Sequence, residues 1–494
     1  MGIIIRQSIK GTFVNYIGSF IGFLTTMFVI TKFRITEEYG LVQVIVNAAI
    51  FICAFAQLGT PSSIFRFFPF FKNDKNNNNG FLFYILLITI VGLSVFIPLY
   101  VFLKEPISAY FSENASLFTN YYYWIIPLII FWAFWVLFEN YANVLMRIVI
   151  PKFIREVAVR ILLLVVYLLY AFNFLDINGL VGGVILVYGT AMILSFIYIS
   201  HISSLSLKHD FSFIDKPLGT KIRNYTSFLL LAALSGSLLQ YLDLFMISSK
   251  MGFYYAGVYT VVSFMAITVE IPSRSITSIA SPIAAKALKE GDMETANSLY
   301  KKVSLHQLIA GSGIFLLIWI NIDNIFAIIP NGDDYVMGKW VVFFLALSKL
   351  ISVTLNFGTT LISFSKYYYW TLFFTVFITG IGIATNLILI PTYGITGAAI
   401  ATLITIILSC IVQQWIVLSK IKGNPYSLGL LKIIIIVPIF FGINLLLPHW
   451  SDNPFVDGIY RTLIIGSIAL TTLYKMRISD EVCSLINKYL KIKS

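Results

Sequence analysis

The chain has 494 residues, of which 59% are hydrophobic and only 11% are charged, and its formal net charge is +12. A soluble domain carries about 25% charged residues, so this composition cannot cover a water-facing surface and excludes an ordinary soluble globular protein. The three cysteines lie apart without metal-ligand or disulfide spacing, and we predict no metal site. No cleavage site follows the first apolar run, so we expect that run to remain as a helix.

Taken in chain order, windows of about 20 apolar residues predict fourteen membrane-spanning helices, and the predicted fold class is an all-α polytopic membrane protein. The approximate ranges are 11–31, 42–65, 81–103, 121–146, 157–175, 180–200, 226–248, 255–273, 303–328, 340–362, 367–390, 395–418, 429–448 and 456–474.

The basic residues predict the orientation of these spans. With the N-terminus inside, 27 of the 34 Lys and Arg residues fall in cytoplasmic segments, 6 fall outside, and Lys349 lies within a span. Cytoplasmic loops are rich in Lys and Arg, so we expect both termini to be cytoplasmic. The net charge then orients the protein, and we predict no nucleic-acid binding. Residues 477–494 repeat apolar residues on one face, which predicts a cytoplasmic amphipathic tail.

Two pairs of segments indicate an internal repeat. At a shift of about 215 residues, "NFLDINGLVGGVIL" (173–186) matches "LILIPTYGITGAAI" (387–400), and "EEYGLVQVIV" (37–46) matches "FYYAGVYTVV" (253–262) at about 216. Such a repeat is typical of transporters whose two halves rock about a central cavity. We therefore predict two pseudo-symmetric six-helix lobes, followed by two peripheral helices and the tail. The predicted ranges are 1–205, 206–420, 421–476 and 477–494.

A few charged residues fall inside or at the ends of the predicted spans, where a charge costs about 2.5 to 3.5 kcal/mol. Lys349 lies near the middle of the tenth span. It is a candidate for binding an anionic substrate, or a structural partner of an acid such as Glu139. Arg66 and Arg274 close the second and eighth helices, where two guanidinium groups could grip a pyrophosphate. The alternative for both is anchoring at the cytoplasmic face.

Three acids within the spans are candidates for ion coupling: Asp243, Glu270 and Glu139. A carboxylate with nearby oxygens suits Na⁺ or a proton, and a structural hydrogen bond between helices is the alternative. Glu270 precedes Pro272, where a break in the helix could serve as a hinge. The four histidines are scattered, and nucleotide-binding glycine patterns are missing. We therefore predict no catalytic residues, no enzyme activity and no cofactor beyond a coupling ion.

Several motifs carry a resemblance to a known family. They are "EEYG" (37–40), "LGTPSSIFRFFP" (58–69), "YLDLFMI" (241–247), "AGVYTVV" (256–262) and "IPTYGITGAAIAT" (390–402). With the pattern of spans, they make the chain resemble the polysaccharide, O-antigen-type flippases of the multidrug/oligosaccharidyl-lipid/polysaccharide exporter superfamily.

The resemblance implies two six-helix lobes around a V-shaped cavity in a bacterial inner membrane. It also implies a substrate, an undecaprenyl-pyrophosphate-linked oligosaccharide moved from the inner to the outer leaflet by alternating access. Arg66, Arg274 and Lys349 would then contact the pyrophosphate. Other expected partners are membrane lipids and glycan-assembly proteins such as a polymerase, and the protein is expected to be a monomer.

Two other functions stay open. A cation-coupled multidrug or metabolite antiporter of the same superfamily shares the fold, but such antiporters commonly stop at twelve helices and prefer cationic substrates. A membrane enzyme of glycan assembly would normally need a larger outer loop with acids and bases. The two additional helices and the basic cytoplasmic segments favour the flippase.

Overall fold

The computed structural model describes residues 2–73, 78–111, 116–203, 219–220, 236–237, 239–367 and 369–490. All regular secondary structure in these ranges is helical, and 11 of the helices are long and apolar enough to cross a membrane. The chain is therefore a multi-pass membrane protein. Residue contacts divide it into two compact units, Met1–Thr260 and Val261–Ser494, which we describe separately. The predicted boundaries of the lobes, the peripheral helices and the tail stay predictions.

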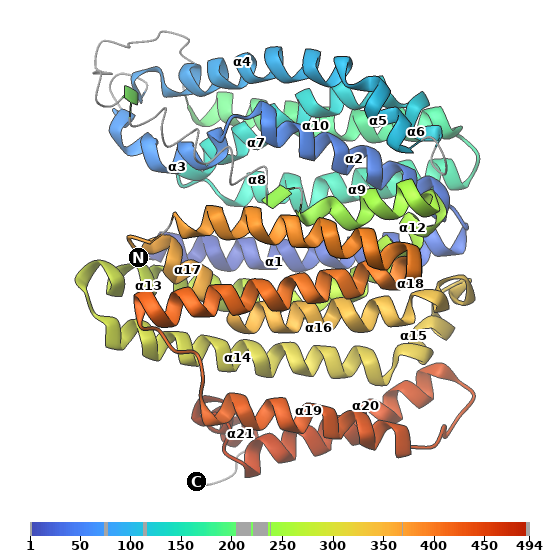
Figure 1. The fold of residues 1–494 in the computed structure, drawn as a ribbon, viewed down its shortest axis with the longest axis vertical. Coiled ribbons are helices and arrows are strands. Elements are labelled where there is room, and N and C mark those ends of the chain that lie inside the picture. The colour runs from blue at the N-terminus through green and yellow to red at the C-terminus, as the bar shows by residue number, and fades with distance from the viewer. Residues whose placement is uncertain are drawn as a thin grey trace. The chain divides into compact units, whose positions relative to one another are not determined.

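The described part of the first unit consists largely of apolar helices (Figure 1). Two of its helices continue directly into single π-helical turns, η1 and η4. Its elements are α1 (Gly2–Leu24), η1 (Thr25–Ile30), α2 (Thr36–Ala56), α3 (Thr60–Phe71), α4 (Phe81–Phe102), α5 (Lys104–Phe111), α6 (Leu117–Asn120), η3 (Tyr122–Trp124), α7 (Ile125–Val144), α8 (Val149–Phe153), η4 (Ile154–Ala158), α9 (Val159–Ala171), α10 (Ile177–Ile202), a helix over 239–251 and the first part of α12 (Phe253–Ile267).

The second unit begins within α12 and contains the longest helices of the chain. Its further elements are η5 (Thr268–Glu270), α13 (Ile271–Glu290), α14 (Met293–Ile320), α15 (Ile322–Ile328), η6 (Gly332–Gly338), α16 (Lys339–Leu355), α17 (Phe357–Phe364), α18 (Trp370–Ile416), η7 (Val417–Ile421), α19 (Leu428–Leu446), α20 (Pro454–Lys475) and α21 (Asp480–Leu490).

The eleven spans and the fourteen predicted ones differ for three local reasons. The predicted span 157–175 lies in a continuous helical stretch from α8 to α9, which the π-helical turn η4 divides into short pieces. The predicted span 226–248 falls largely outside the described residues. The predicted spans 367–390 and 395–418 both lie in α18, so they count as a single span of 49 residues, Phe373–Ile421.

The length of α18 shows that it cannot be one straight membrane helix. It has 47 residues, so a straight helix would extend about 70 Å, against about 30 Å for the hydrocarbon core. The backbone leaves helical geometry at Gly394, with φ 60° and ψ −138°. A Cβ atom on Gly397 would lie 2.0 Å from the carbonyl oxygen of Leu389, so the chain passes very close to itself here. Figure 1 shows α18 as two arms that run in opposite directions. The predicted spans 367–390 and 395–418 are thus separated by one non-helical glycine.

The predicted second span, 42–65, is wrong in its extent, because two helices share it. Helix α2 ends at Ala56, and α3 begins at Thr60 after a turn in which Leu58 and Gly59 have positive φ values of 49° and 73°. A left-handed backbone at Gly59 carries no Cβ penalty, and Pro61 then suits the start of the next helix.

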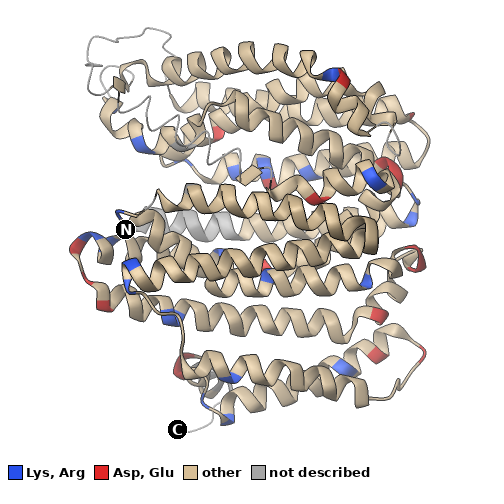
Figure 2. Ribbon diagram, viewed as in Figure 1, with Lys and Arg blue, Asp and Glu red and all other residues tan. Residues whose placement is uncertain are grey.

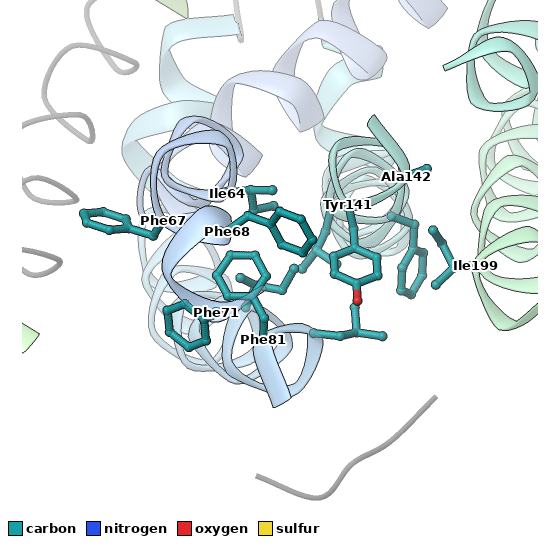
Figure 3. Close-up of a cluster of buried hydrophobic side chains, with 12 residues drawn as sticks. Ile64, Phe67, Phe68, Phe71, Phe81, Tyr141, Ala142 and Ile199 are labelled. Carbon is teal, nitrogen blue, oxygen red and sulfur yellow. The ribbon is translucent and has the colours of Figure 1, made fainter. Parts of the chain in front are cut away.

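Helix α3 is fixed by its apolar side. Ile64, Phe67, Phe68 and Phe71 recur at helical spacing and belong to one buried cluster with residues of α4, α7 and α10. Figure 3 shows the rings of Phe68, Phe71, Phe81 and Tyr141 gathered in this cluster. Arg66 lies on the exposed side of the same helix. It therefore belongs to a separate helix held by aromatic packing rather than to the end of the second span.

Helices α2 and α12 cross each other at two glycines. A Cβ on Gly40 would lie 2.0 Å from the carbonyl oxygen of Phe253, and a Cβ on Gly257 would lie 1.9 Å from that of Thr36. Thr36 and Phe253 are the first residues of the two helices, so each helix start lies against a glycine four residues into the other. This reciprocal contact joins the two matched segments "EEYGLVQVIV" and "FYYAGVYTVV" at one point. Glycines of this kind allow helix backbones to approach closely in lipid.

The tail contains a helix, α21, that is joined to α14 by polar contacts. Lys302 on α14 lies 3.0 Å from a carboxylate oxygen of Glu481, and His306 Nε2 lies 3.1 Å from Ser479 Oγ. The hydrogen bond from Lys302 lowers the pKa of Glu481 from its usual value to about 2. Lys432 on α19 also donates to the carbonyl oxygen of Met476, just before the tail. The tail is thereby attached to the second unit.

We expect Lys302→Ala to release α21 from α14. The pKa of Glu481 is lowered in the folded protein, so its contribution to docking is fully present above about pH 4.5 and is lost as the pH falls towards 2. Both side chains are half exposed or more, so the effect concerns local docking rather than global stability. Amide hydrogen exchange should rise in α21 and nowhere else. Lys286→Ala is the control, because its contact with Glu290 is long and exposed, at 3.9 Å. Equal protection of α21 in both variants would contradict the attachment.

Candidate functional site

Charged residues are sparse along the helices, and Figure 2 shows long helical stretches without any. Where acids and bases do occur within the spans, several of them lie in contact with each other. Such pairing lowers the cost of placing charges in a membrane, because each member neutralises the other. The candidate site of each unit is built on one of these pairs.

In the second unit, Lys349 and Glu270 form an ion pair. Lys349 Nζ lies 3.2 Å from Glu270 Oε2, and the two side chains are 37% and 33% exposed. Lys349 is in α16, ten residues after the helix begins, and Glu270 ends the 3-10 turn η5. The acid that contacts Lys349 is thus Glu270 rather than Glu139.

The backbone around Glu270 explains how this residue is presented. The 3-10 turn η5 separates α12 from α13, and Pro272 at the second position of α13 supplies no N–H group. The Ser273 hydroxyl donates a 2.9 Å hydrogen bond to the carbonyl oxygen of Glu270, which stabilises the turn. Short 3-10 segments within a helix often mark a hinge. The predicted break next to Glu270 is therefore present.

Arg274 and Arg66 each lie in a helix that has proline at its second position, Pro272 in α13 and Pro61 in α3. Arg274 is the fourth residue of α13, and Arg66 is the seventh residue of α3. Both side chains are exposed. Among the described residues, no ion pair of Arg274 is found. Exposed guanidinium groups are reached by water and solutes, and their planar fork suits a bidentate contact with an anion.

In the first unit, Glu139 pairs with Arg155. A carboxylate oxygen of Glu139 lies 2.6 Å from Arg155, and the Glu139 side chain is only 11% exposed. The guanidinium group also lies over the ring of Trp135, 5.4 Å from its centroid. Trp135 and Glu139 are one turn apart on α7, so they hold Arg155 from the same helix face. This cation–π contact and the ion pair fix a half-exposed guanidinium group.

Sequence analysis did not single out Arg155, and it therefore missed this residue as the partner of Glu139. Arg155 is on the π-helical turn η4 together with Glu156. Arg160, one turn later, donates to Glu156 at 2.8 Å and to the carbonyl oxygen of Gly18 at 2.7 Å. Single π-helical turns inside helices are frequent at functional sites, but they leave no clear mark in a sequence. The alternation of acids and bases from 152 to 160 is the one available signal.

Asp243 is held by a tyrosine. The hydroxyl of Tyr259 donates a 2.7 Å hydrogen bond to Asp243 Oδ2, and Tyr259 itself is buried. This contact joins the helix over 239–251 to α12 within the first unit. A partly buried carboxylate that already has one hydroxyl donor can exchange a proton or bind a small cation.

Comparisons with known proteins identify the fold. No family model matches the chain, and no curated protein matches it. Among solved structures it is similar to the lipid II flippase MurJ in an inward closed conformation, with a TM-score of 0.70, 15% identity, and coverage of 95% of this chain and 99% of that one.

Multidrug transporters give lower scores. An outward-facing multidrug resistance MATE family transporter of the MOP superfamily has a TM-score of 0.57, 16% identity, and coverage of 85% of this chain and 96% of that one. A MOP superfamily transporter from Pyrococcus furiosus gives 0.55 at 14% identity, with the same two coverages. At these identities the similarity concerns the fold, which is that of the MOP superfamily transporters.

Proposed function

We propose that the chain is a flippase that moves an undecaprenyl-pyrophosphate-linked oligosaccharide from the cytoplasmic to the outer leaflet. The observation that carries this proposal is the similarity to a lipid-linked substrate flippase, which extends over 95% of this chain, whereas the multidrug transporters cover 85%. The motifs of the O-antigen-type flippases support the choice of an oligosaccharide. The expected location is a bacterial inner membrane with both termini in the cytoplasm.

In this proposal, the cations act on the pyrophosphate. Arg66 and Arg274 are exposed on α3 and α13, and they capture the anionic head group at the cytoplasmic side. Lys349 holds the pyrophosphate at membrane depth while the prenyl chain stays in lipid. Alternating access then exposes the glycan on the outer side. Each step relies on charge-assisted contacts, which are stronger away from bulk water.

Ion coupling is a second part of the proposal. Asp243, Glu270 and Glu139 are the acids that bind a proton or Na⁺, and each has a partner in the structure: Tyr259, Lys349 and Arg155. An ion shifts a conformational equilibrium only by its difference in affinity for the two states. Imposed proton or Na⁺ gradients should therefore change the flipping rate, and a rate that ignores both gradients would exclude coupling.

Lys349→Gln is expected to reduce flipping by at least about tenfold, because a lost charge-assisted hydrogen bond is worth about 1.5 to 3 kcal/mol. Arg66→Gln and Arg274→Gln should reduce it as well. The assay follows a fluorescent undecaprenyl-pyrophosphate oligosaccharide in proteoliposomes, with surface glycan display in cells as a second readout. Lys339→Gln is the control, because Lys339 pairs with Asp323 at the start of α16. Normal rates in all three test variants would refute the proposed roles of these cations.

A cation-coupled antiporter is the second candidate, and the Asp243–Tyr259 contact favours it. A carboxylate that accepts a hydroxyl hydrogen bond can also bind a cationic substrate or a coupling ion. Proteoliposomes that accumulate a cationic dye in exchange for protons or Na⁺, and that do not flip the lipid-linked oligosaccharide, would decide for the antiporter.

A further inference from the structure

The ion pair between Lys349 and Glu270 joins two residues that sequence reasoning assigned to different roles, one to the substrate and the other to the coupling ion. Their charged atoms are 3.2 Å apart. At this distance Lys349 is already neutralised, so an incoming anion does not meet a free cation. Any anion that binds Lys349 must compete with the carboxylate of Glu270.

Helix packing fixes the positions of Lys349 and Glu270. Helix α14 packs against both of the elements that carry them, because a Cβ on Gly311 would lie 2.8 Å from Leu350 and 3.7 Å from Val269. Leu350 follows Lys349 in α16, and Val269 precedes Glu270 in η5. The backbones are therefore fixed at close range, while both side chains keep about a third of their surface exposed. The ion pair is therefore not enclosed by the packing of these helices.

We propose that Glu270 is an internal counterion that occupies Lys349 until the substrate pyrophosphate displaces it. This inference rests on the proposed flippase function and adds its regulation. Displacement leaves the carboxylate of Glu270 without its cation, in a place where an unpaired charge is costly. Uptake of a proton or a cation by Glu270 removes that cost. Anion binding at Lys349 and cation binding at Glu270 therefore promote each other.

The coupling follows from linkage. If a proton on Glu270 raises the affinity of Lys349 for the anion by some factor, the anion raises the affinity of Glu270 for the proton by the same factor. Coupling between two sites is typically 5-fold to 150-fold. Because the ion pair is partly exposed, we expect the coupling between Lys349 and Glu270 to lie near the lower end of that range.

In the described part of the chain, few other charged side chains lie near Glu270. Lys349 contacts it from α16, and Arg274 follows it by one turn on α13. Between His306 and Asp323, the chain of α14 and its connection to α15 carries no ionisable side chain. The polar residues near Gly311 on α14 are Gln307 and Ser312, which are neutral. A substitution of Glu270 is therefore expected to act first on Lys349.

The test measures binding of farnesyl pyrophosphate to the full-length protein in lipid nanodiscs. Glu270→Gln should tighten binding by roughly tenfold, and Lys349→Gln should weaken it. The double variant should match Lys349→Gln, because the counterion has no effect once the cation is gone. Asp323→Asn is the matched control, since it removes the acid from another acid–lysine pair of α16, with an N–O distance of 2.6 Å.

The outcomes separate this inference from the proposed function. Weaker binding by Lys349→Gln without tighter binding by Glu270→Gln would refute the counterion and leave the flippase proposal standing. Unchanged binding by Lys349→Gln would refute both roles of Lys349. If Glu270→Gln does not fold, Glu270→Asp shortens the side chain by one methylene group, and it should tighten binding in the same direction by a smaller factor. Unchanged or weaker binding by a folded Glu270→Asp would then overturn the counterion.

Discussion

Gly257→Ala should sharply reduce the yield and melting temperature of the protein in detergent. The added Cβ would lie 1.9 Å from the carbonyl oxygen of Thr36, which belongs to the backbone and cannot rotate away. Helices α2 and α12 must then separate or slide. Overpacking in a well-packed interior costs about 1 to 3 kcal/mol, and a backbone clash lies at the upper end of that range.

Gly40→Ala should act in the same direction, since its Cβ would lie 2.0 Å from the carbonyl oxygen of Phe253. The double variant should lose less stability than the sum of the losses in the two single variants, because the first separation of the helices makes room for the second methyl group. Gly380→Ala in α18 is the matched control, because its added methyl group would meet no neighbouring atom within 4 Å. If Gly257→Ala and Gly380→Ala melted alike, the close crossing would be wrong.

Arg461→Met should destabilise the packing of α20 against α15 and α19 by about 3 to 5 kcal/mol. This is the cost of removing one member of a buried ion pair, because the other charge is then buried without a partner. Asp457 and Arg461 are 1% and 4% exposed, and their charged atoms are 2.7 Å apart. Arg461 also donates to Asn444 at 2.9 Å and to the carbonyl oxygen of Leu447 at 3.2 Å. Asp457 accepts from Asn324 at 2.9 Å. This cluster therefore holds α15, α19 and α20 together.

The measurement is amide hydrogen exchange in the connection between α19 and α20, together with thermal melting. Arg461→Lys should be intermediate, because lysine keeps the charge but cannot reach several acceptors in one plane. Replacing both partners, as in Asp457→Leu with Arg461→Met, should restore much of the stability that Arg461→Met loses, since no buried charge then remains unpaired. A double variant as unstable as Arg461→Met alone would show that the unpaired charge is not the cause.

The membrane class and most of the spans could be predicted from the sequence, because apolar runs of about 20 residues are a local property. Prediction from local sequence failed where a short backbone feature decides where one helix ends and the next begins. The positive φ at Gly59 splits the predicted second span into α2 and α3, and the single break at Gly394 divides α18. Glycine permits these conformations without requiring them, so its presence alone did not locate them.

The sequence could not predict which acids and bases form ion pairs, for a different reason. Lys349 was expected to bind a substrate or an acid such as Glu139, and its contact in the structure is Glu270. Glu139 instead lies against Arg155, which the sequence analysis did not single out. The choice of partner depends on which helices pack together, and no local pattern encodes that choice. The roles of Arg66, Arg274, Lys349, Asp243, Glu270 and Glu139 in transport stay predictions.

The separation of Glu270 and Lys349 along the chain has a consequence for biosynthesis. Lys349 follows Glu270 by 79 residues, whereas Arg155 follows Glu139 by only 16. At a ribosomal rate of 5 to 20 residues per second, Glu270 emerges roughly 4 to 16 seconds before its partner. During that interval the carboxylate of Glu270 has no lysine partner to lower the cost of placing it in the membrane. The insertion of α12 and α13 is therefore expected to finish only when α16 arrives, and a nascent chain that ends before α16 should leave this part of the protein incompletely inserted.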